Sequence, residues 1–128
     1  QKLGIGYTNY FNLKYDRSGV LFQGKFKAVS IETDVQFTHI SRYIHLNPVE
    51  LIEPGWKKEG IINWKEVKKF LEAYRLSSYL DYIDKKNFPS LINKKFLLDH
   101  FDSEKKYQKF VEDWALKDSD SIRDLTIE

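Results

Sequence analysis

The sequence predicts an α+β fold that is mainly helical, and three observations support this prediction. Apolar side chains recur at helical spacing in several separate segments. A Thr or Asn stands three residues before a Gln or Glu at the start of two of these segments, which is the pattern of a capping box. One short segment alone is rich in the β-branched and aromatic residues that favour a strand. A length of 128 residues with 41% hydrophobic content suits one domain with a modest core.

The N-terminal third is predicted to contain one helix and one strand. Helical spacing runs from Gln1 to about Tyr15 and stops at the turn-like sequence Asp16–Gly19. The segment Lys25–Ile31 is predicted to be a strand, and its lysines favour an edge position. Because one strand cannot form a sheet, its partners are expected outside this chain or in a second copy of it.

A second helix is predicted to begin at a capping box formed by Thr33 and Gln36. Pro48 is predicted to end or kink this helix, because a proline biases the residue before it away from helical dihedral angles. Two neighbouring stripes follow this helix. The apolar stripe consists of Phe37, Ile40 and Ile44, and the polar stripe consists of Gln36, His39, Tyr43 and Asn47. Side chains four positions apart lie on one helical face, so we expect the Tyr43 phenol and the Asn47 carboxamide to be neighbours.

Three further helices are predicted in the C-terminal half. They span about Asn63 to Tyr74, where Asn63 and Glu66 form the second capping box, about Lys94 to His100, and about Ser103 to Leu116. The polar tail from Lys117 to Glu128 is predicted to fray. We therefore expect two parts: residues 1–52, which carry the strand and the helix of Tyr43, and residues 53–128, which form an appended helical region.

The composition excludes several classes of protein. The chain has no cysteine, which rules out disulfides and thiolate metal sites and is typical of a cytoplasmic protein. No apolar run approaches the roughly 18 residues that a membrane-spanning helix needs, so no membrane is expected as a partner. The chain contains no methionine and opens at Gln1, so we expect it to be an interior stretch of a longer protein.

Positive charge is concentrated in residues 1–30, although the formal net charge of the chain is only +2. Five cations stand there against the single carboxylate of Asp16: Lys2, Lys14, Arg17, Lys25 and Lys27. Aromatic residues are interleaved with them, and this mixture suits phosphate neutralisation combined with stacking on unpaired bases. The alternative is that the lysines solvate one face while the aromatic side chains fill a core.

Several ordered motifs of this chain resemble the C-terminal part of the REP-associated tyrosine transposases, which are single-tyrosine HUH endonucleases of bacteria. The resemblance is dense over about residues 4 to 50 and rests on four strings: Tyr7–Asn12, Arg17–Gly19, Leu21–Ala28 and Ser41–Val49. Further along, Arg75–Tyr79 resembles the Trp-Ser-Ser-Tyr segment of that family with its tryptophan replaced. The resemblance implies the C-terminal part of a ferredoxin-like HUH nuclease domain, with one or two strands and the nucleophile helix, followed by a small helical unit.

The resemblance also implies roles for two residues. Tyr43 matches the nucleophile, which attacks a DNA phosphodiester, forms a 5′-phosphotyrosine and releases a 3′-hydroxyl. Asn47 matches the polar residue that joins two histidines in holding a divalent ion, Mg²⁺ or Mn²⁺. A metal on the scissile phosphate neutralises developing charge, which a poorly nucleophilic phenol needs. The alternatives are an ordinary half-buried helix tyrosine at Tyr43 and, at Asn47, an N-cap before Pro48.

The chain departs from the family at the metal site. The His-hydrophobic-His strand that gives the family its name is absent, and none of the three histidines, His39, His45 and His100, stands in a His-x-His arrangement. We therefore expect the longer protein to be a metal-dependent nuclease and this chain alone to be inactive and to hold no metal. His45 is expected to have a surface or capping role.

Five residues of the basic third are predicted to contact DNA: Lys14, Arg17, Gln23, Lys25 and Lys27. For the last three, the alternative is that they protect a sheet edge from pairing. The expected partner is single-stranded or hairpin DNA, together with a homodimer or a strand-exchanged assembly of this chain. Two other functions remain open from the sequence, namely a non-catalytic DNA-binding module and a helical protein-interaction domain.

Overall fold

A computed structural model of the chain describes residues 2–116. Helices and irregular segments make up this described part, which contains no β-strand, so the prediction of a mainly helical protein is confirmed. The chain divides after Ile31 into two compact units. The tail that we expected to fray, residues 117–128, lies outside the described residues.

The first unit contains one helix, α1 (Lys2–Lys14), followed by a tight turn. The predicted helix is thereby confirmed to within a residue or two. The turn is closed by the Asn12 side chain, whose Nδ2 donates to the carbonyl of Gly19 at 2.9 Å. Gly19 has φ of 93°, a left-handed backbone conformation that glycine adopts without strain. None of the side chains of α1 is buried.

The strand predicted over Lys25–Ile31 is not formed. The segment has no regular secondary structure, and its residues are exposed, with 89% of Phe26 and 82% of Val29 accessible to solvent. A strand requires a neighbour that pairs with its N–H and C=O groups, and the described part of the chain offers none. The β-branched and aromatic composition is therefore present without the pairing that would turn it into a strand.

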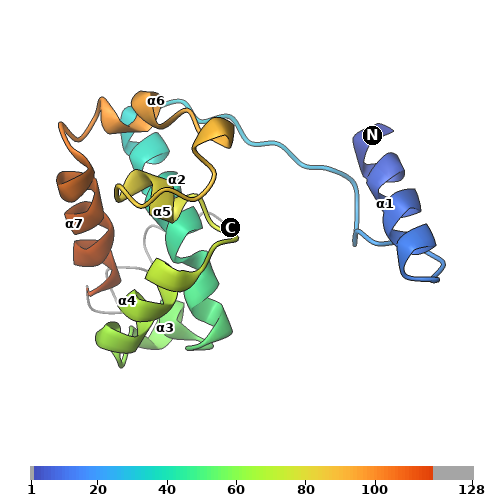
Figure 1. Ribbon diagram of the computed structural model, residues 1–128, viewed down its shortest axis with the longest axis horizontal. Helices are drawn as coiled ribbons and strands as arrows, with labels where there is room; N and C mark the ends of the chain where they lie inside the picture. Colours follow the sequence, from blue (N-terminus) through green and yellow to red (C-terminus); the bar gives the residue numbers. More distant parts are fainter. Residues whose placement is uncertain (1, 117–128) are drawn as a thin grey trace. The chain divides into compact units, whose positions relative to one another are not determined.

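The second unit is built around helix α2 (Asp34–Leu46), which packs against α7 (Glu104–Ala115), as Figure 1 shows. The N-terminus of α2 is capped as predicted, because Thr33 Oγ1 accepts the N–H of Gln36 at 3.1 Å. The Gln36 carboxamide accepts the N–H of Glu32 at 2.9 Å, one residue upstream of the usual capping-box partner.

The C-terminus of α2 differs from the prediction in one respect. We expected Pro48 to bias Asn47 away from helical dihedral angles. Instead Asn47 keeps helical values, with φ of −51° and ψ of −39°, and its N–H donates to the carbonyl of Tyr43. The chain then continues from the end of α2 into the 3₁₀-helix η1 (Asn47–Leu51), in which Pro48 takes a first-turn position that needs no N–H donor.

The remaining elements complete a small helical unit. They are α3 (Trp56–Glu59), α4 (Trp64–Ala73), α5 (Tyr79–Tyr82), η2 (Pro89–Leu91) and α6 (Lys94–Leu98). The predicted helices that correspond to α4, α6 and α7 are confirmed. Asn63 Oδ1 accepts the N–H of Glu66 at 3.3 Å and caps α4, and Ser103 Oγ caps α7 in the same way. The short helices α3 and α5 were not predicted from the sequence.

The hydrophobic core of the second unit is formed by side chains of every α-helix from α2 to α7 and of η1. Its largest members are Trp56 and Trp114, whose rings meet edge to face at 5.9 Å between centroids. The apolar stripe of α2 is only partly covered. Phe37 packs on Phe96 of α6 at 5.0 Å between centroids, whereas Ile44 is 55% exposed. The side of α2 that faces the core is instead partly polar and buries His39 and His45.

Candidate functional site

Tyr43 and Asn47 are brought together at the C-terminal end of α2. The Asn47 N–H donates to the Tyr43 carbonyl, so the two residues lie one helical turn apart. Tyr43 is half-buried against the core and Asn47 is exposed. A third side chain, Lys57, contacts both the phenol and the carboxamide, as expected if the two groups lie on one helical face.

Lys57 joins the phenol and the carboxamide from the short helix α3. Its Nζ donates to Tyr43 Oη at 3.1 Å and to Asn47 Oδ1 at 2.8 Å. The same ammonium lies 4.5 Å from the centroid of the Tyr43 ring, within the range of a cation–π interaction. One lysine therefore holds both residues that the sequence singled out, and sequence reasoning did not find it.

The loop before α3 determines where Lys57 lies. Gly55 adopts the left-handed conformation, with φ of 84°, and its N–H is accepted by Glu50 Oε1 at 3.0 Å. The chain thereby turns back, so that Trp56 is buried with 1% of its surface exposed and Lys57 follows it beside α2. The Glu53 carboxylate fixes the other side of the loop by accepting N–H groups of residues 62 and 63. These contacts hold the loop and thereby place the Lys57 ammonium beside Tyr43.

The charge of Lys57 has no carboxylate partner. Five lysines of the second unit form ion pairs with carboxylates within 4.0 Å, and Lys57 is not one of them among residues 2–116. Its two hydrogen-bond acceptors are neutral oxygens. The Lys57 ammonium is therefore a positive charge beside Tyr43 that no carboxylate within 4.0 Å neutralises in the described part of the chain, and such a charge favours an anionic ligand.

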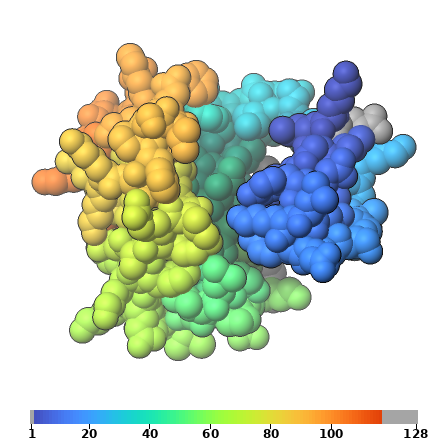
Figure 2. All heavy atoms as spheres, turned by 45° about the vertical axis from the view of Figure 1, so that its right-hand side comes forward, coloured from blue at the N-terminus to red at the C-terminus, as the bar shows by residue number. Residues whose placement is uncertain are grey.

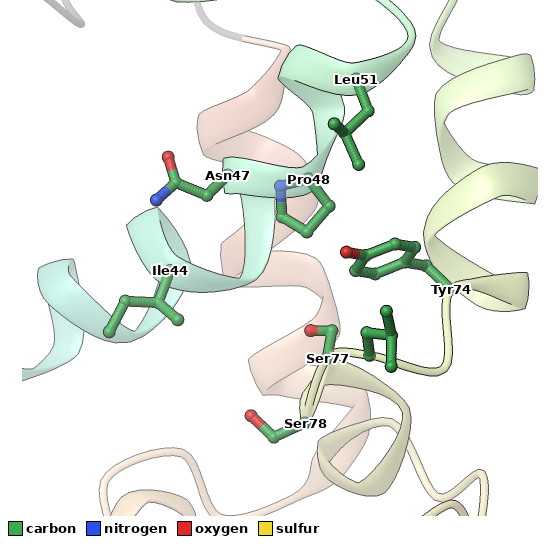
Figure 3. A pocket seen from close by; sticks show the side chains of 8 residues that line it. Ile44, Asn47, Pro48, Leu51, Tyr74, Ser77 and Ser78 are labelled. Carbon is green, nitrogen blue, oxygen red and sulfur yellow. The ribbon is translucent and has the colours of Figure 1, made fainter. Parts of the chain in front are cut away.

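A shallow groove of about 530 Å³ begins on the other side of Asn47. It is lined by Ile44, Asn47, Pro48, Leu51, Tyr74, Leu76, Ser77 and Ser78. Figure 3 shows the Tyr74 ring facing Pro48 across the groove and the Ser77 and Ser78 hydroxyls at one end. In Figure 2, side chains of η1 and of the α4–α5 region adjoin on one face of the second unit. The groove is mostly apolar and meets the Tyr43 site at Asn47, whose side-chain oxygen contacts the Lys57 ammonium.

His45 lies in the core, so the surface or capping role expected for it is wrong. Its Nδ1 lies 2.6 Å from Tyr107 Oη and its Nε2 lies 2.8 Å from Ser78 Oγ. Tyr107 donates its own proton to Ser41 Oγ at 3.2 Å, so the consistent arrangement has a neutral His45 that donates from Nδ1 and accepts at Nε2. Burial lowers the pKa of His45 from 6.5 to about 4, which keeps the ring neutral. Burial likewise raises the pKa of Tyr107.

The side chains near Asn47 are engaged in other contacts. Within residues 2–116 there is no group of three or more His, Cys, Asp or Glu side chains that could hold one. The Asn47 oxygen that would serve as a ligand accepts a hydrogen bond from an ammonium instead. His45, the histidine nearest to Asn47 in the sequence, uses both ring nitrogens within the core. The Asn47 oxygen, which the resemblance assigns to a metal, therefore contacts a cationic lysine in this structure.

The five residues predicted to contact DNA belong to the first unit, and all five are exposed: Lys14, Arg17, Gln23, Lys25 and Lys27. Two of them lie against aromatic rings. The Lys14 ammonium is 5.6 Å from the centroid of Tyr10, and the Arg17 guanidinium is 5.7 Å from that of Phe11. The aromatic side chains of this unit do not fill a core, because α1 buries none of its residues. Cations and aromatic rings that are at least partly exposed are therefore adjacent on this surface.

Comparisons of this chain with protein-family models, with curated proteins and with solved structures give no match. None of the helices among the described residues is both long enough and apolar enough to cross a membrane. The chemistry of Tyr43 and its neighbours, together with the sequence motifs, is therefore what indicates a function.

Proposed function

We propose that this chain is the C-terminal part of a REP-associated tyrosine transposase, a single-tyrosine HUH endonuclease of bacteria. In this proposal the longer protein is cytoplasmic and cleaves and rejoins single-stranded or hairpin DNA through a 5′-phosphotyrosine. The observation that supports it best is the half-buried phenol of Tyr43, which a lysine without a carboxylate partner holds beside Asn47. A phenol with an ammonium beside its oxygen suits attack on a phosphodiester anion.

The proposed reaction is a transesterification at phosphorus. Tyr43 Oη forms the new bond to phosphorus, the bond from phosphorus to the 3′-oxygen breaks, and the proton lost by the phenol balances the proton gained by the departing 3′-hydroxyl. Rejoining is the reverse attack by a DNA 3′-hydroxyl, so no external energy source is needed. The rigid attachment of Tyr43 to α2 and Lys57 supplies the fixed orientation that such an attack requires.

The metal remains part of the proposal for the longer protein only. Mg²⁺ or Mn²⁺ would be held there by a histidine pair supplied by residues upstream of this chain, with Asn47 as a third ligand once the Lys57 ammonium leaves its oxygen. The ferredoxin-like sheet of the HUH domain and the division into residues 1–52 and 53–128 belong to the same proposal. A homodimer or a strand-exchanged assembly also stays a prediction.

A non-catalytic DNA-binding module is the second candidate function. It is favoured by the first unit, in which Lys14 lies against the exposed ring of Tyr10 and Arg17 lies against the partly exposed ring of Phe11. Such a surface neutralises phosphates and stacks on bases without any chemistry. The two candidates differ in a single respect that can be measured, which is whether Tyr43 becomes covalently linked to DNA.

The test uses the protein extended at its N-terminus to include the upstream residues, mixed with labelled hairpin DNA and Mg²⁺. We expect Tyr43→Phe to keep DNA affinity and to lose both cleavage and the covalent adduct, because phenylalanine preserves the ring packing and removes only the nucleophilic oxygen. Tyr74→Phe, a tyrosine of the adjoining groove, is the matched control and should form adduct at the wild-type level. An undiminished adduct with Tyr43→Phe on a denaturing gel would refute the assignment.

A further inference from the structure

Lys57 has spare capacity to bind an anion. A lysine ammonium has three N–H donors, and the contacts to Tyr43 Oη and Asn47 Oδ1 use two of them. Both acceptors are neutral, and no carboxylate in the described part of the chain lies within ion-pair distance of Lys57. The lysines at positions 68, 85, 94, 95 and 106 do have such partners. The ammonium of Lys57, which lies beside Tyr43, is therefore not neutralised by a carboxylate of the described residues.

The position of Lys57 is fixed by its surroundings. The preceding residue, Trp56, is buried against Trp114, and the ammonium rests over the Tyr43 ring at 4.5 Å from its centroid. A side chain held in this way loses little freedom when it binds a ligand, in contrast to a lysine that extends freely into solvent. Lys58, its neighbour on α3, is exposed and makes no side-chain hydrogen bond or ion pair within residues 2–116.

We propose that Lys57 binds a phosphate group of single-stranded DNA at Tyr43. This inference rests on the proposed function, because it takes the ligand of Tyr43 to be a phosphodiester. A phosphorus atom within reach of Tyr43 Oη brings its non-bridging oxygens close to an ammonium that is already 3.1 Å from that phenol oxygen. The third N–H of the ammonium can donate to a phosphate oxyanion, and because this charge-assisted hydrogen bond is stronger than the one to the neutral Asn47 oxygen, the ammonium turns away from Asn47 towards the phosphate.

Binding of a phosphate by Lys57 also affects Asn47. When the ammonium turns towards a phosphate, the Asn47 oxygen is released from its hydrogen bond. Substrate binding and the availability of Asn47 are thereby coupled through one side chain. Lys57 is thus a substrate-contacting residue that the family strings in this sequence do not include.

The test measures binding of a fluorescein-labelled single-stranded oligonucleotide to the 128-residue chain over a series of salt concentrations. Loss of one phosphate contact reduces the slope of log K against log salt by about 0.7 for single-stranded DNA. We expect this reduction for Lys57→Gln and no change for the matched control Lys58→Gln. Lys57→Arg, which keeps the charge, should restore the wild-type slope.

The outcomes separate the inference from the proposed function. Salt-dependent binding by the wild-type chain together with identical slopes for Lys57→Gln and Lys58→Gln overturns the role of Lys57 alone. No salt-dependent binding by the wild-type chain also overturns the role of Lys57, whereas the proposed function is overturned separately, if the N-terminally extended protein forms no covalent adduct through Tyr43. Circular dichroism checks that each variant is folded. If Lys57→Gln is not folded, Lys57→Met replaces it, because methionine keeps an apolar stem over the Tyr43 ring, and the same slopes decide.

Discussion

Acid should destabilise the second unit through His45. Burial lowers the pKa of this histidine to about 4 in the folded unit, whereas the unfolded chain takes up the proton near 6.5. Below pH 6.5 the unfolded state therefore binds a proton that the folded state does not, and the free energy of unfolding decreases as the pH falls. The contribution is complete above the unfolded pKa and is lost as the pH drops towards 4. At 1.36 kcal/mol per pKa unit the loss is about 3 kcal/mol.

This magnitude is large compared with the total stability of a small domain, which is about 5–15 kcal/mol. The assay is urea unfolding followed by circular dichroism between about pH 7 and pH 4. Carboxylates also contribute to acid sensitivity, so the quantity to measure is the difference between wild type and His45→Gln, which cannot titrate at this position. We expect that difference in free energy of unfolding to shrink by about 3 kcal/mol across the window.

The control for His45 is a histidine with a different environment. His100 is less buried, with 27% of its side chain exposed, and its Nε2 lies 3.6 Å from an Asp34 carboxylate oxygen. His100→Gln is the matched substitution, because it makes the same exchange of side chains at a position outside the core. A difference between wild type and His45→Gln that stays constant from neutral pH to pH 4 would show that His45 is not held neutral by burial, and the reasoning would fail.

Two further predictions concern the basic surface and the support of the site. Changing four cations of the first unit together to alanine should reduce the slope of log K against log salt for DNA binding by up to about 3 units. The four are Lys14, Arg17, Lys25 and Lys27. An unchanged slope would mean that these charges only solvate the surface. Trp56→Ala should lower the free energy of unfolding by about 3–5 kcal/mol, since this side chain is fully buried. Urea unfolding measures that loss, and a loss below about 1 kcal/mol would contradict the packing of Trp56 in the core.

Local sequence signals predicted the longer helices of the second unit correctly. Thr33 and Asn63 cap their helices through hydrogen bonds to residues three positions ahead, so the whole interaction is visible in a short stretch of sequence. The neighbouring positions of Tyr43 and Asn47 also follow from helical periodicity alone. These predictions succeeded because they depend on contacts within one or two turns of chain.

The predictions that were wrong depend on contacts between residues far apart in the sequence or outside the described residues. The strand over Lys25–Ile31 required a pairing partner that the described residues do not contain. His45 was placed at the surface because its two partners, Ser78 and Tyr107, stand 33 and 62 residues away in the sequence. A lone histidine on a helix gives no local indication that distant hydroxyl groups will satisfy it.

Lys57 was missed for a related reason. Its contact with Tyr43 depends on the left-handed turn at Gly55 and on the burial of Trp56, which together bring α3 back against α2. The dipeptide Pro54-Gly55 is typical of a loop, and the tryptophan directly after it was the one available signal that the next residue would be held close to the core.

The central claim is that Tyr43 is the nucleophile, and identifying the amino acid that carries the DNA tests it most directly. The N-terminally extended protein is incubated with hairpin DNA and Mg²⁺, the adduct is digested with nuclease and protease, and the modified peptide is sequenced by mass spectrometry. We predict a nucleotide linked through its 5′-phosphate to the oxygen of Tyr43. A nucleotide on any other residue, or cleaved DNA whose 5′-ends carry no protein, would contradict the proposal.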